Sequence, residues 1–336
     1  MRVISLFSGA GGFDLGFVWA GHEIVWANDN YHDAVETYAA NLGKHIVECD
    51  IRDVGSEDIP AGDIVLGGFP CQGFSVANTG RSVDDSRNTL YREMVRIVRD
   101  KAPAYFLAEN VKGMLSLAGG KVFEYILREF SALGYRVRHS VLDAADFGVP
   151  QHRQRLFLLG TRNGVEFEPG FPSPTHFEPG GLMAEMKCAH QWVTVGEALK
   201  GIPEPENAAD IPNHTYSRYK LRFNNYLGHR RVDPGRPAPT VTSRGDSRGG
   251  VVIIHHPRNH RRMSVRELAC VQSFPMEFVF HGSQTSGYRQ VANAVPPLLA
   301  RAIAKEFPVS LEGASVEDAE KAVSQLQVAL GKFPSD

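Results

Sequence analysis

Cysteine is scarce in this sequence of 336 residues, which contains only four, and no two of them form a C-x-x-C pair. Scattered single thiols favour neither a disulfide framework nor a zinc site. Long apolar runs are also missing, since no stretch of eighteen apolar residues occurs, and the first residues lack the features of a signal peptide. We therefore expect a cytoplasmic protein without a membrane segment.

Acidic residues are scarce in one segment only. Residues 214–262 contain eleven Lys and Arg against two Asp, whereas the remainder of the chain has 25 basic and 36 acidic residues. The formal net charge of −2 for the whole chain hides this contrast. A local basic excess fits a surface that binds phosphates, and it fits equally well an ordinary solvated face.

The first half of the chain alternates apolar strand-like runs with helical patterns. These runs are rich in Val, Ile, Leu and Phe, which indicates a parallel sheet covered by helices on both faces. The pattern predicts a doubly wound α/β fold. Two later runs, "YRVRHSVLDA" (135–144) and "RLFLLGTR" (155–162), are expected to add an antiparallel pair at the sheet edge and so to make the sheet mixed.

The composition changes after residue 162. A segment rich in Pro and Gly, 163–181, is typical of a linker that leaves the first domain. A helix is predicted from Ser264, because Glu267 completes a capping pattern three residues later. A further helix is predicted over 296–307, where prolines occupy the first turn, and a last one over 315–330.

Three strand ends in the first half describe a crevice for a nucleoside. The first strand leads into the glycine-rich turn of "SLFSGAGGFDLGF" (5–17), where a ligand can approach the backbone at a helix N-terminus. Asp29 follows about twenty residues later, where a carboxylate accepts ribose hydroxyls. Asp50 and Ile51 come at the end of the third strand, where we expect them to lie beside an adenine. The glycine-rich turn departs from the pattern G-x-G-x-x-G, which counts against NAD as the ligand. An adenosyl compound is the alternative that stays open.

Two reactive side chains are expected at the same edge. In "GGFPCQGFS" (67–75), Cys71 follows Pro70 in a loop after the fourth strand, outside the apolar run where a structural cysteine would be expected. Glu109 ends the fifth strand in "AEN". A thiolate that adds to an electron-poor ring and an acid that protonates or hydrogen-bonds a ring nitrogen form a sensible pair. An inert buried thiol and a surface carboxylate stay open as alternatives.

Six stretches in order, "FSGAGG", "GGFPCQGFS", "AENVKG", "QHRQR", "RELACVQSFP" and "QVANAVP", resemble the successive motifs of the DNA cytosine-5 methyltransferases. The resemblance spans residues 3 to about 305. It implies S-adenosyl-L-methionine as cofactor and a cytosine flipped out of double-stranded DNA. It also implies that Cys71 adds to C6, that Glu109 bonds N3 and the exocyclic amine, and that Arg153 is the catalytic arginine. We expect Arg155 to be mainly structural or to contact DNA.

The resemblance further implies three parts of the chain and two sets of contacts. Residues 1–185 form the catalytic and cofactor-binding domain, 186–282 the smaller target-recognition domain, and 283–336 the return to the first domain. The residues expected to bind the cofactor are Phe7, Gly9, Gly11, Asp29, Asn30, Asp50, Ile51, Pro70, Leu90, Asn293 and Val295. Those expected to contact DNA are Gln72, Ser75, Arg155, Thr240, Val241, Arg244 and Arg248.

Two positions depart from the family pattern. Ala292 stands where glycine is common, and Asn30 stands where a bulky side chain often stacks on adenine. We expect a modest weakening of cofactor binding at most. His255, His256 and His260 cluster without a nearby carboxylate or thiol, so no metal site is expected.

Several functional alternatives remain at this point. We expect a monomeric enzyme that is a solitary modifier or works beside a separate restriction endonuclease. A tRNA cytosine-5 methyltransferase is the runner-up, because relatives of this family use the same pocket on RNA. A catalytically silent DNA-binding module and an NAD-dependent oxidoreductase are further alternatives.

Overall fold

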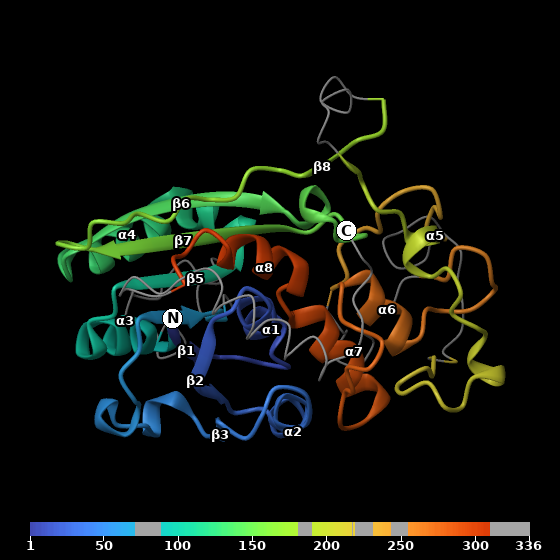
Figure 1. Cartoon of the computed structure of the whole chain (residues 1–336), viewed down its shortest axis with the longest axis horizontal. Helices are drawn as coiled ribbons and strands as arrows, with labels where there is room; N and C mark the ends of the chain where they lie inside the picture. The colour runs from blue at the N-terminus through green and yellow to red at the C-terminus, as the bar shows by residue number, and fades with distance from the viewer. Residues whose placement is uncertain (71–88, 181–189, 217, 219–230, 243–254, 310–336) are drawn as a thin grey trace.

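A single seven-stranded sheet forms the centre of the protein (Figure 1). The computed structural model describes residues 1–70, 89–180, 190–216, 218, 231–242 and 255–309. The strand order is β3-β2-β1-β4-β5-β7-β6. Only β7 runs against its neighbours, pairing antiparallel with both β5 and β6. The prediction of a doubly wound mixed sheet with an antiparallel edge pair is confirmed. The strands of this sheet are Arg2–Leu6 (β1), Glu23–Asp29 (β2), Ile46–Glu48 (β3), Ile64–Gly67 (β4), Tyr105–Val111 (β5), Tyr135–Asp143 (β6) and Gln154–Arg162 (β7).

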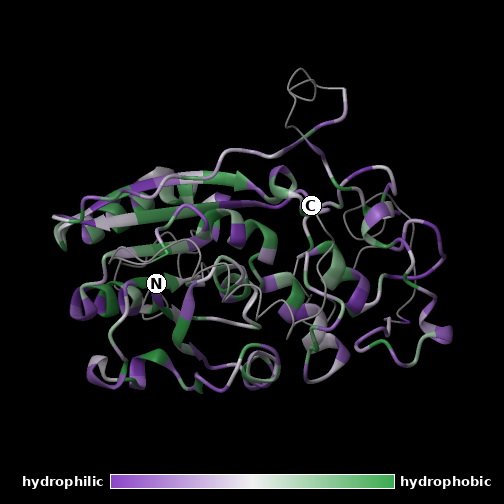
Figure 2. Ribbon diagram, in the orientation of Figure 1, coloured by the Kyte–Doolittle hydropathy of each residue, from purple (hydrophilic) through white to green (hydrophobic). Residues whose placement is uncertain are grey.

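The central strands are apolar on both faces because both faces are covered. Successive residues of a strand point to opposite sides, so Val3 and Ile4 of β1 enter two different cores, and each is fully buried. Figure 2 shows the apolar residues concentrated on the strands of this sheet and on the helices beside them. Continuous apolar runs are therefore what a doubly covered parallel sheet requires.

The helices divide between the two faces. Helices α1 and α2 share a core with α8 on one face, and α3 and α4 share a core on the other. Helix α1 lies so close to α8 that a Cβ at Gly16 would be 2.6 Å from the carbonyl oxygen of Pro297. Helix α8, late in the described chain, thus packs on the first strand-helix unit (Figure 1). These helices span Gly12–Trp19 (α1), His32–Asn41 (α2), Thr89–Lys101 (α3), Lys121–Ala132 (α4) and Pro297–Ala304 (α8).

The second half of the described chain is mostly irregular. A two-stranded pair, β8 (His176–Phe177) with β9 (His190–Gln191), precedes the short helix α5 (Val195–Ala198). Helices α6 (Val265–Val271) and α7 (Gln284–Asn293) pack together in a separate core.

The predicted caps of two helices are confirmed. The hydroxyl of Ser264 accepts a hydrogen bond from the backbone N–H of Glu267, whose carboxylate accepts one from the backbone N–H of Ser264. Helix α8 starts with prolines, as its sequence predicts. The helix predicted over 315–330 lies outside the described residues. In the parts of the chain that the structure covers, no helix is long and apolar enough to cross a membrane.

Candidate active site

The turn after β1 has an unusual backbone. Phe7 and Gly9 both have φ near 56°, and Gly11 has φ 84°. Such angles are uncommon for a residue with a side chain, so Phe7 is a local outlier of the kind that clusters at ligand sites. A Cβ at Gly11 would lie 2.3 Å from Cδ1 of Leu42, so this turn needs glycine there. Residues 7–9 of this turn are partly exposed, whereas Gly11 and Gly12 at the start of α1 are buried.

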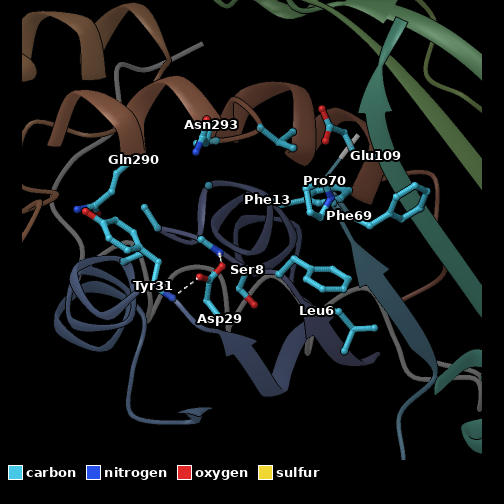
Figure 3. A pocket seen from close by; sticks show the side chains of 18 of the residues that line it. Leu6, Ser8, Phe13, Asp29, Tyr31, Phe69, Pro70, Glu109, Gln290 and Asn293 are labelled. Carbon is cyan, nitrogen blue, oxygen red and sulfur yellow. Dashed lines mark hydrogen bonds between the residues drawn. The ribbon is translucent and has the colours of Figure 1, made fainter. Parts of the chain in front are cut away.

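Asp29 holds this turn at the end of β2. Its Oδ2 accepts a hydrogen bond from the N–H of Gly9 and its Oδ1 one from the N–H of Tyr31, both at 2.8 Å (Figure 3). Burial raises the pKa of this carboxyl, and the two backbone donors oppose that rise. The carboxylate thus fixes two strand ends against each other and also lines the cavity between them.

A cavity of about 730 Å³ opens beside these strand ends. This size falls within the range of cofactor sites in proteins, about 300–1,000 Å³. Gly11 does not line it; its neighbour Gly12 does. The predicted cofactor residues that do line it are Phe7, Gly9, Asp29, Asn30, Asp50, Ile51, Pro70, Leu90, Asn293 and Val295.

The carboxylate of Asp50 is less available to a ligand than the sequence suggests. Its carboxylate accepts hydrogen bonds from the backbone N–H and the guanidinium of Arg52. The guanidinium holds the pKa of Asp50 below its usual value. Asp50 therefore enters the site as an ionised, partnered group.

Tyr31 and Arg289 line the same cavity, although neither belongs to the residues expected to bind the cofactor or DNA. The guanidinium carbon of Arg289 lies 4.0 Å from the centre of the Tyr31 ring. The Tyr31 hydroxyl donates to Asp33 and lies 2.5 Å from Oγ of Ser286. The fixed ring stands one residue after Asn30, where the family pattern expects bulk. No sequence spacing links residues 31 and 289, which come together only through the fold.

Glu109 and Arg155 form an ion pair at the other end of the cavity. Nε of Arg155 on β7 lies 2.8 Å from Oε1 of Glu109 on β5, and both side chains are largely buried. Burial raises the pKa of Glu109, although Arg155 and Arg153 act against it. A raised pKa makes it easier for Glu109 to take up a proton, and the protonated acid is the form able to donate to a ring nitrogen.

The loop after β4 lies against this carboxylate. A Cβ at Gly68 would be 3.4 Å from Oε2 of Glu109. The side-chain amide of Asn110 donates to the carbonyl of Phe69 at 2.9 Å, so the residue after Glu109 holds the loop just before Pro70. Figure 3 shows Pro70 beside Glu109. Cys71, Gln72 and Ser75 lie outside the described residues.

Arg153 has a different environment from Arg155. It is 1% exposed, and its guanidinium donates to the backbone carbonyls of Val241, Ala292 and Ala294 at 2.9, 2.7 and 3.1 Å. Arg155, and not Arg153, makes the ion pair with Glu109. Both arginines line the cavity, but they differ in their partners.

The segment around Thr240 and Val241 joins the same region. The hydroxyl of Thr240 donates to the carbonyl of His152 at 2.7 Å, and Val241 lines the cavity. Arg244 and Arg248 lie outside the described residues. In the part of the chain that can be described, no three His, Cys, Asp or Glu side chains are grouped to hold a metal ion.

Comparison with known proteins identifies the family. A family model described as C-5 cytosine-specific DNA methylase matches residues 1–308. The chain belongs to this family. The fold, the glycine-rich turn and the acidic strand ends of the cavity are thus those of a DNA cytosine methyltransferase.

Two relatives of this DNA cytosine methyltransferase are bacterial and archaeal enzymes. Type II methyltransferase M.NgoFVII of Neisseria gonorrhoeae is 38% identical over 97% of this chain and 92% of the relative. Type II methyltransferase M.MthTI of Methanothermobacter thermautotrophicus is 35% identical over 93% of this chain and 98% of the relative. Both names place the relatives among the methyltransferases of restriction-modification systems.

Solved structures share the whole fold. An E. coli prophage protein described as a DNA modification methyltransferase superposes with a TM-score of 0.72 and 26% identity, covering 91% of this chain and 98% of that one. The Dnmt2 methyltransferase of S. pombe has a TM-score of 0.64 at 20% identity, covering 91% and 96%, and shows the fold alone.

These findings decide between the functional alternatives. An NAD-dependent oxidoreductase is excluded by the family, and a tRNA substrate is not favoured, because the family model and the relatives' names point to DNA. Family and fold together imply the use of S-adenosyl-L-methionine.

Proposed function

We propose that this methyltransferase converts a cytosine of a short recognition sequence in duplex DNA into 5-methylcytosine, with Cys71 as nucleophile and S-adenosyl-L-methionine as methyl donor. The observation that carries the proposal is that one cavity is lined by the acidic strand ends as well as by Glu109 and Arg155. A cofactor and a ring held by Glu109 would then lie in the same cavity. The target base must leave the DNA stack to enter it.

The residues of the cavity fit S-adenosyl-L-methionine. The carboxylate of Asp29 suits ribose hydroxyls, and the exposed backbone of the turn at Gly9 allows close approach. Ile51, Leu90 and Val295 offer apolar walls to an adenosyl group. The cofactor, when bound, supplies a methyl group attached to a positively charged sulfur, which is a strong electrophile.

The protein's own groups then activate the ring. Attack of the Cys71 thiolate on C6 forms a covalent bond and pushes electron density toward N3 and C5. Glu109, held by Arg155, donates a hydrogen bond or proton to N3 and so stabilises the charge that develops there. C5 becomes nucleophilic and attacks the methyl group, and the cofactor would leave as the neutral thioether S-adenosylhomocysteine. Loss of the C5 proton to water, return of any N3 proton to Glu109 and elimination of the thiolate then restore the aromatic ring and free Cys71.

In this proposal the two arginines have separate tasks. Arg155 accompanies Glu109 and lies where it reaches the ring or its backbone phosphate, so we assign it the catalytic contact. Arg153 is a positioning residue, because its hydrogen bonds within the described residues go to backbone carbonyls. The intact pair of Glu109 with Arg155 also argues against a catalytically silent DNA-binding module.

Bisulfite sequencing of DNA from a host that expresses the protein tests the activity and gives the recognition sequence. We expect 5-methylcytosine at one short sequence. A Cys71→Ser variant should leave no methylation, while Cys270→Ser, which changes a thiol of α6 outside the cavity, should methylate normally. Normal turnover of Cys71→Ser, or methylation of tRNA but not of duplex DNA, would overturn the proposal.

A covalent trap tests the nucleophile directly. A duplex with 5-fluorocytosine in the recognition sequence cannot lose its C5 substituent, so the adduct with Cys71 should persist. We expect a denaturation-resistant complex in the presence of the cofactor, and none with Cys71→Ser. An adduct that maps to another residue would contradict the assignment of Cys71.

A further inference from the structure

Two buried glutamines meet between the two halves of the cavity. Gln151 precedes β7 and Gln272 caps the C-terminus of α6, and both side chains are fully buried. The side-chain amide of Gln151 donates to the side-chain oxygen of Gln272. Buried amides are costly unless all their groups are bonded, so the other partners of this pair decide what it does.

Each glutamine holds a different wall of the cavity. The side-chain oxygen of Gln151 accepts a hydrogen bond from the N–H of Val241 at 2.9 Å. The side-chain amide of Gln272 donates to the carbonyls of Val291 and Ala294 at 2.9 and 3.0 Å. Val241 and Ala294 both line the cavity. Val241 lies on the side of the basic segment, and Ala294 stands between the proposed cofactor residues Asn293 and Val295.

The hydrogen bonds run in one direction. The N–H of Val241 donates to Gln151, Gln151 donates to Gln272, and Gln272 donates to the carbonyl of Ala294. Each amide is therefore oriented by the next, because reversing one would place two donors or two acceptors together. Bonds aligned in this way polarise one another in a buried site.

Arg153 closes the chain into a ring. It donates to the carbonyls of Val241 and Ala294, the same two residues that the ends of the glutamine bridge contact. A shift of Val241 thus requires either a broken buried bond or an accompanying shift of Ala294. The two walls behave as one mechanical unit.

We propose that the Gln151–Gln272 bridge couples cofactor binding to DNA binding. A cofactor that fixes the backbone at 293–295 fixes Val241 through the bridge, and so favours the arrangement that accepts the target nucleotide. By thermodynamic reciprocity, DNA that fixes Val241 increases the affinity for the cofactor by the same factor. Gln151 and Gln272 are positioning residues in this scheme. The inference rests on the proposed function, since it requires cofactor and DNA in this cavity.

The coupling is measured with S-adenosylhomocysteine, which occupies the cofactor site without reacting. Its Kd is determined by calorimetry for the full-length protein alone and for the protein saturated with a duplex that carries the sequence found by bisulfite sequencing. The ratio of the two constants reports the coupling. We expect tighter binding in the presence of DNA, within the range of about 5–150-fold usual for coupled sites.

The variant Gln272→Met should bring this ratio close to one. A purely structural role would instead weaken both complexes equally and leave the ratio unchanged. Should Gln272→Met fail to fold, the double variant Gln151→Met with Gln272→Met replaces both side-chain amides by apolar groups, so neither glutamine is left facing an apolar partner. The remaining cost is the acceptor lost by the N–H of Val241 and the donor lost by the carbonyls of Val291 and Ala294. The same loss of the ratio is expected there.

Asn41→Ala is the matched control. Its side-chain amide also bridges two segments, since it donates to the carbonyl of Val279 and accepts from the N–H of the same residue, away from the cavity. We expect lower stability with an unchanged ratio. A wild-type ratio of one, or a full ratio in the glutamine variants, overturns the coupling. Failure of the wild type to bind S-adenosylhomocysteine or to methylate DNA would instead overturn the proposed function.

Discussion

At the scale of single residues, Arg155 and Arg153 show how two positions of one motif differ in task. Arg155→Ala removes the cation beside Glu109. We expect the single-turnover rate of methylation to fall by about a hundredfold or more, as when a preorganised electrostatic contact is lost. Stability should change little, because Glu109 can take up a proton once its partner is gone. Rapid-quench assays and thermal unfolding measure the two quantities.

Unlike Arg155→Ala, the variant Arg153→Ala should lower the stability of the protein. It removes the guanidinium that donates to the buried carbonyls of Val241 and Ala292, at a cost of about 1–3 kcal/mol for each unsatisfied group. Since about 1 kcal/mol moves Tm by roughly 2–4 °C in a domain of this size class, we expect a loss of several degrees. An unchanged Tm together with a collapsed rate would restore the catalytic role to Arg153.

The sequence could not separate these two arginines for a physical reason. Residues 153 and 155 are two apart in an extended segment, so their side chains leave on the same side. The choice depends on the register of β7 against β5, where Arg155 pairs with Val111 and thus lies diagonal to Glu109. The spacing of two residues within one strand does not reveal how that strand pairs with its neighbour.

Asp14 is a residue that no motif marks as special. It is fully buried in α1, and its carboxylate accepts hydrogen bonds from the hydroxyls of Ser5 and Tyr38, both at 2.7 Å. Burial raises the pKa of Asp14 to about 6, although these two donors oppose the rise. Asp14 therefore takes up a proton more readily in the folded state than in the unfolded state. The stability that Asp14 contributes is complete below pH 4 and is lost as the pH rises through 6.

Replacing Asp14 with Asn should remove this pH dependence. The amide keeps an acceptor for Ser5 and gains a donor for Tyr38, and it does not ionise. Relative to the wild type, we expect Asp14→Asn to gain about 3 kcal/mol of unfolding free energy between pH 4 and pH 8, since the shift is about two units. Urea unfolding across this range measures it. Asp58→Asn, at an exposed carboxylate, should reproduce the wild-type profile, and a flat difference for Asp14→Asn would refute the argument.

At the scale of elements, the sequence predicts the seven-stranded sheet better than it predicts the structure of the second half of the chain. Strand β4 (IVLG) and the first four residues of β5 (YFLA) are continuous apolar runs because they are buried on both faces, and such runs are visible in the sequence. Residues 190–262 carry no comparable period. Where they are described, isolated bridges such as Gln151 with Ala238 hold them instead of regular ladders. Pairings of this kind depend on distant segments, so no local pattern reports them.

The contact between the glycine-rich turn and α7 yields a prediction at this scale. A Cβ at Gly12 would lie 2.5 Å from the carbonyl oxygen of Val295 and 3.0 Å from the ring of Phe274. Because the first of these is backbone, Gly12→Ala must push the segment after α7 outward. We expect a loss of about 1–3 kcal/mol in stability, as for other overpacked sites. Weaker S-adenosylhomocysteine binding should accompany it, because Val295 lines the cavity.

Gly113→Ala is the control for this prediction. No atom lies within 4 Å of the Cβ position at Gly113, and its backbone does not have a positive φ. Denaturant unfolding should therefore show wild-type stability for Gly113→Ala and a lower midpoint for Gly12→Ala. Equal stability of the two variants would mean that the turn and α7 are not in fixed contact.

At the scale of the whole molecule, the basic segment is less available for DNA than its count of residues suggests. Arg261 lies within 214–262, but its guanidinium is 6% exposed and binds the carboxylates of Glu267 and Glu204. The pair outweighs burial and lowers the pKa of Glu267. The sequence cannot distinguish such an internal cation from a phosphate contact. Arg218, Arg236 and Arg258 of the same segment are exposed.

This difference predicts how salt acts on the complex with DNA. Each cation that neutralises a phosphate releases counterions, so the logarithm of the binding constant falls with the logarithm of salt concentration by about 0.9 per contact. Alanine at Arg218, Arg236 and Arg258 together should reduce the steepness of that dependence by up to about three, measured by fluorescence anisotropy between 50 and 300 mM salt. Arg128→Ala, a highly exposed cation on α4, should leave it unchanged. If the triple variant keeps the wild-type slope, the phosphates are bound elsewhere, and the local charge excess is only a solvated face.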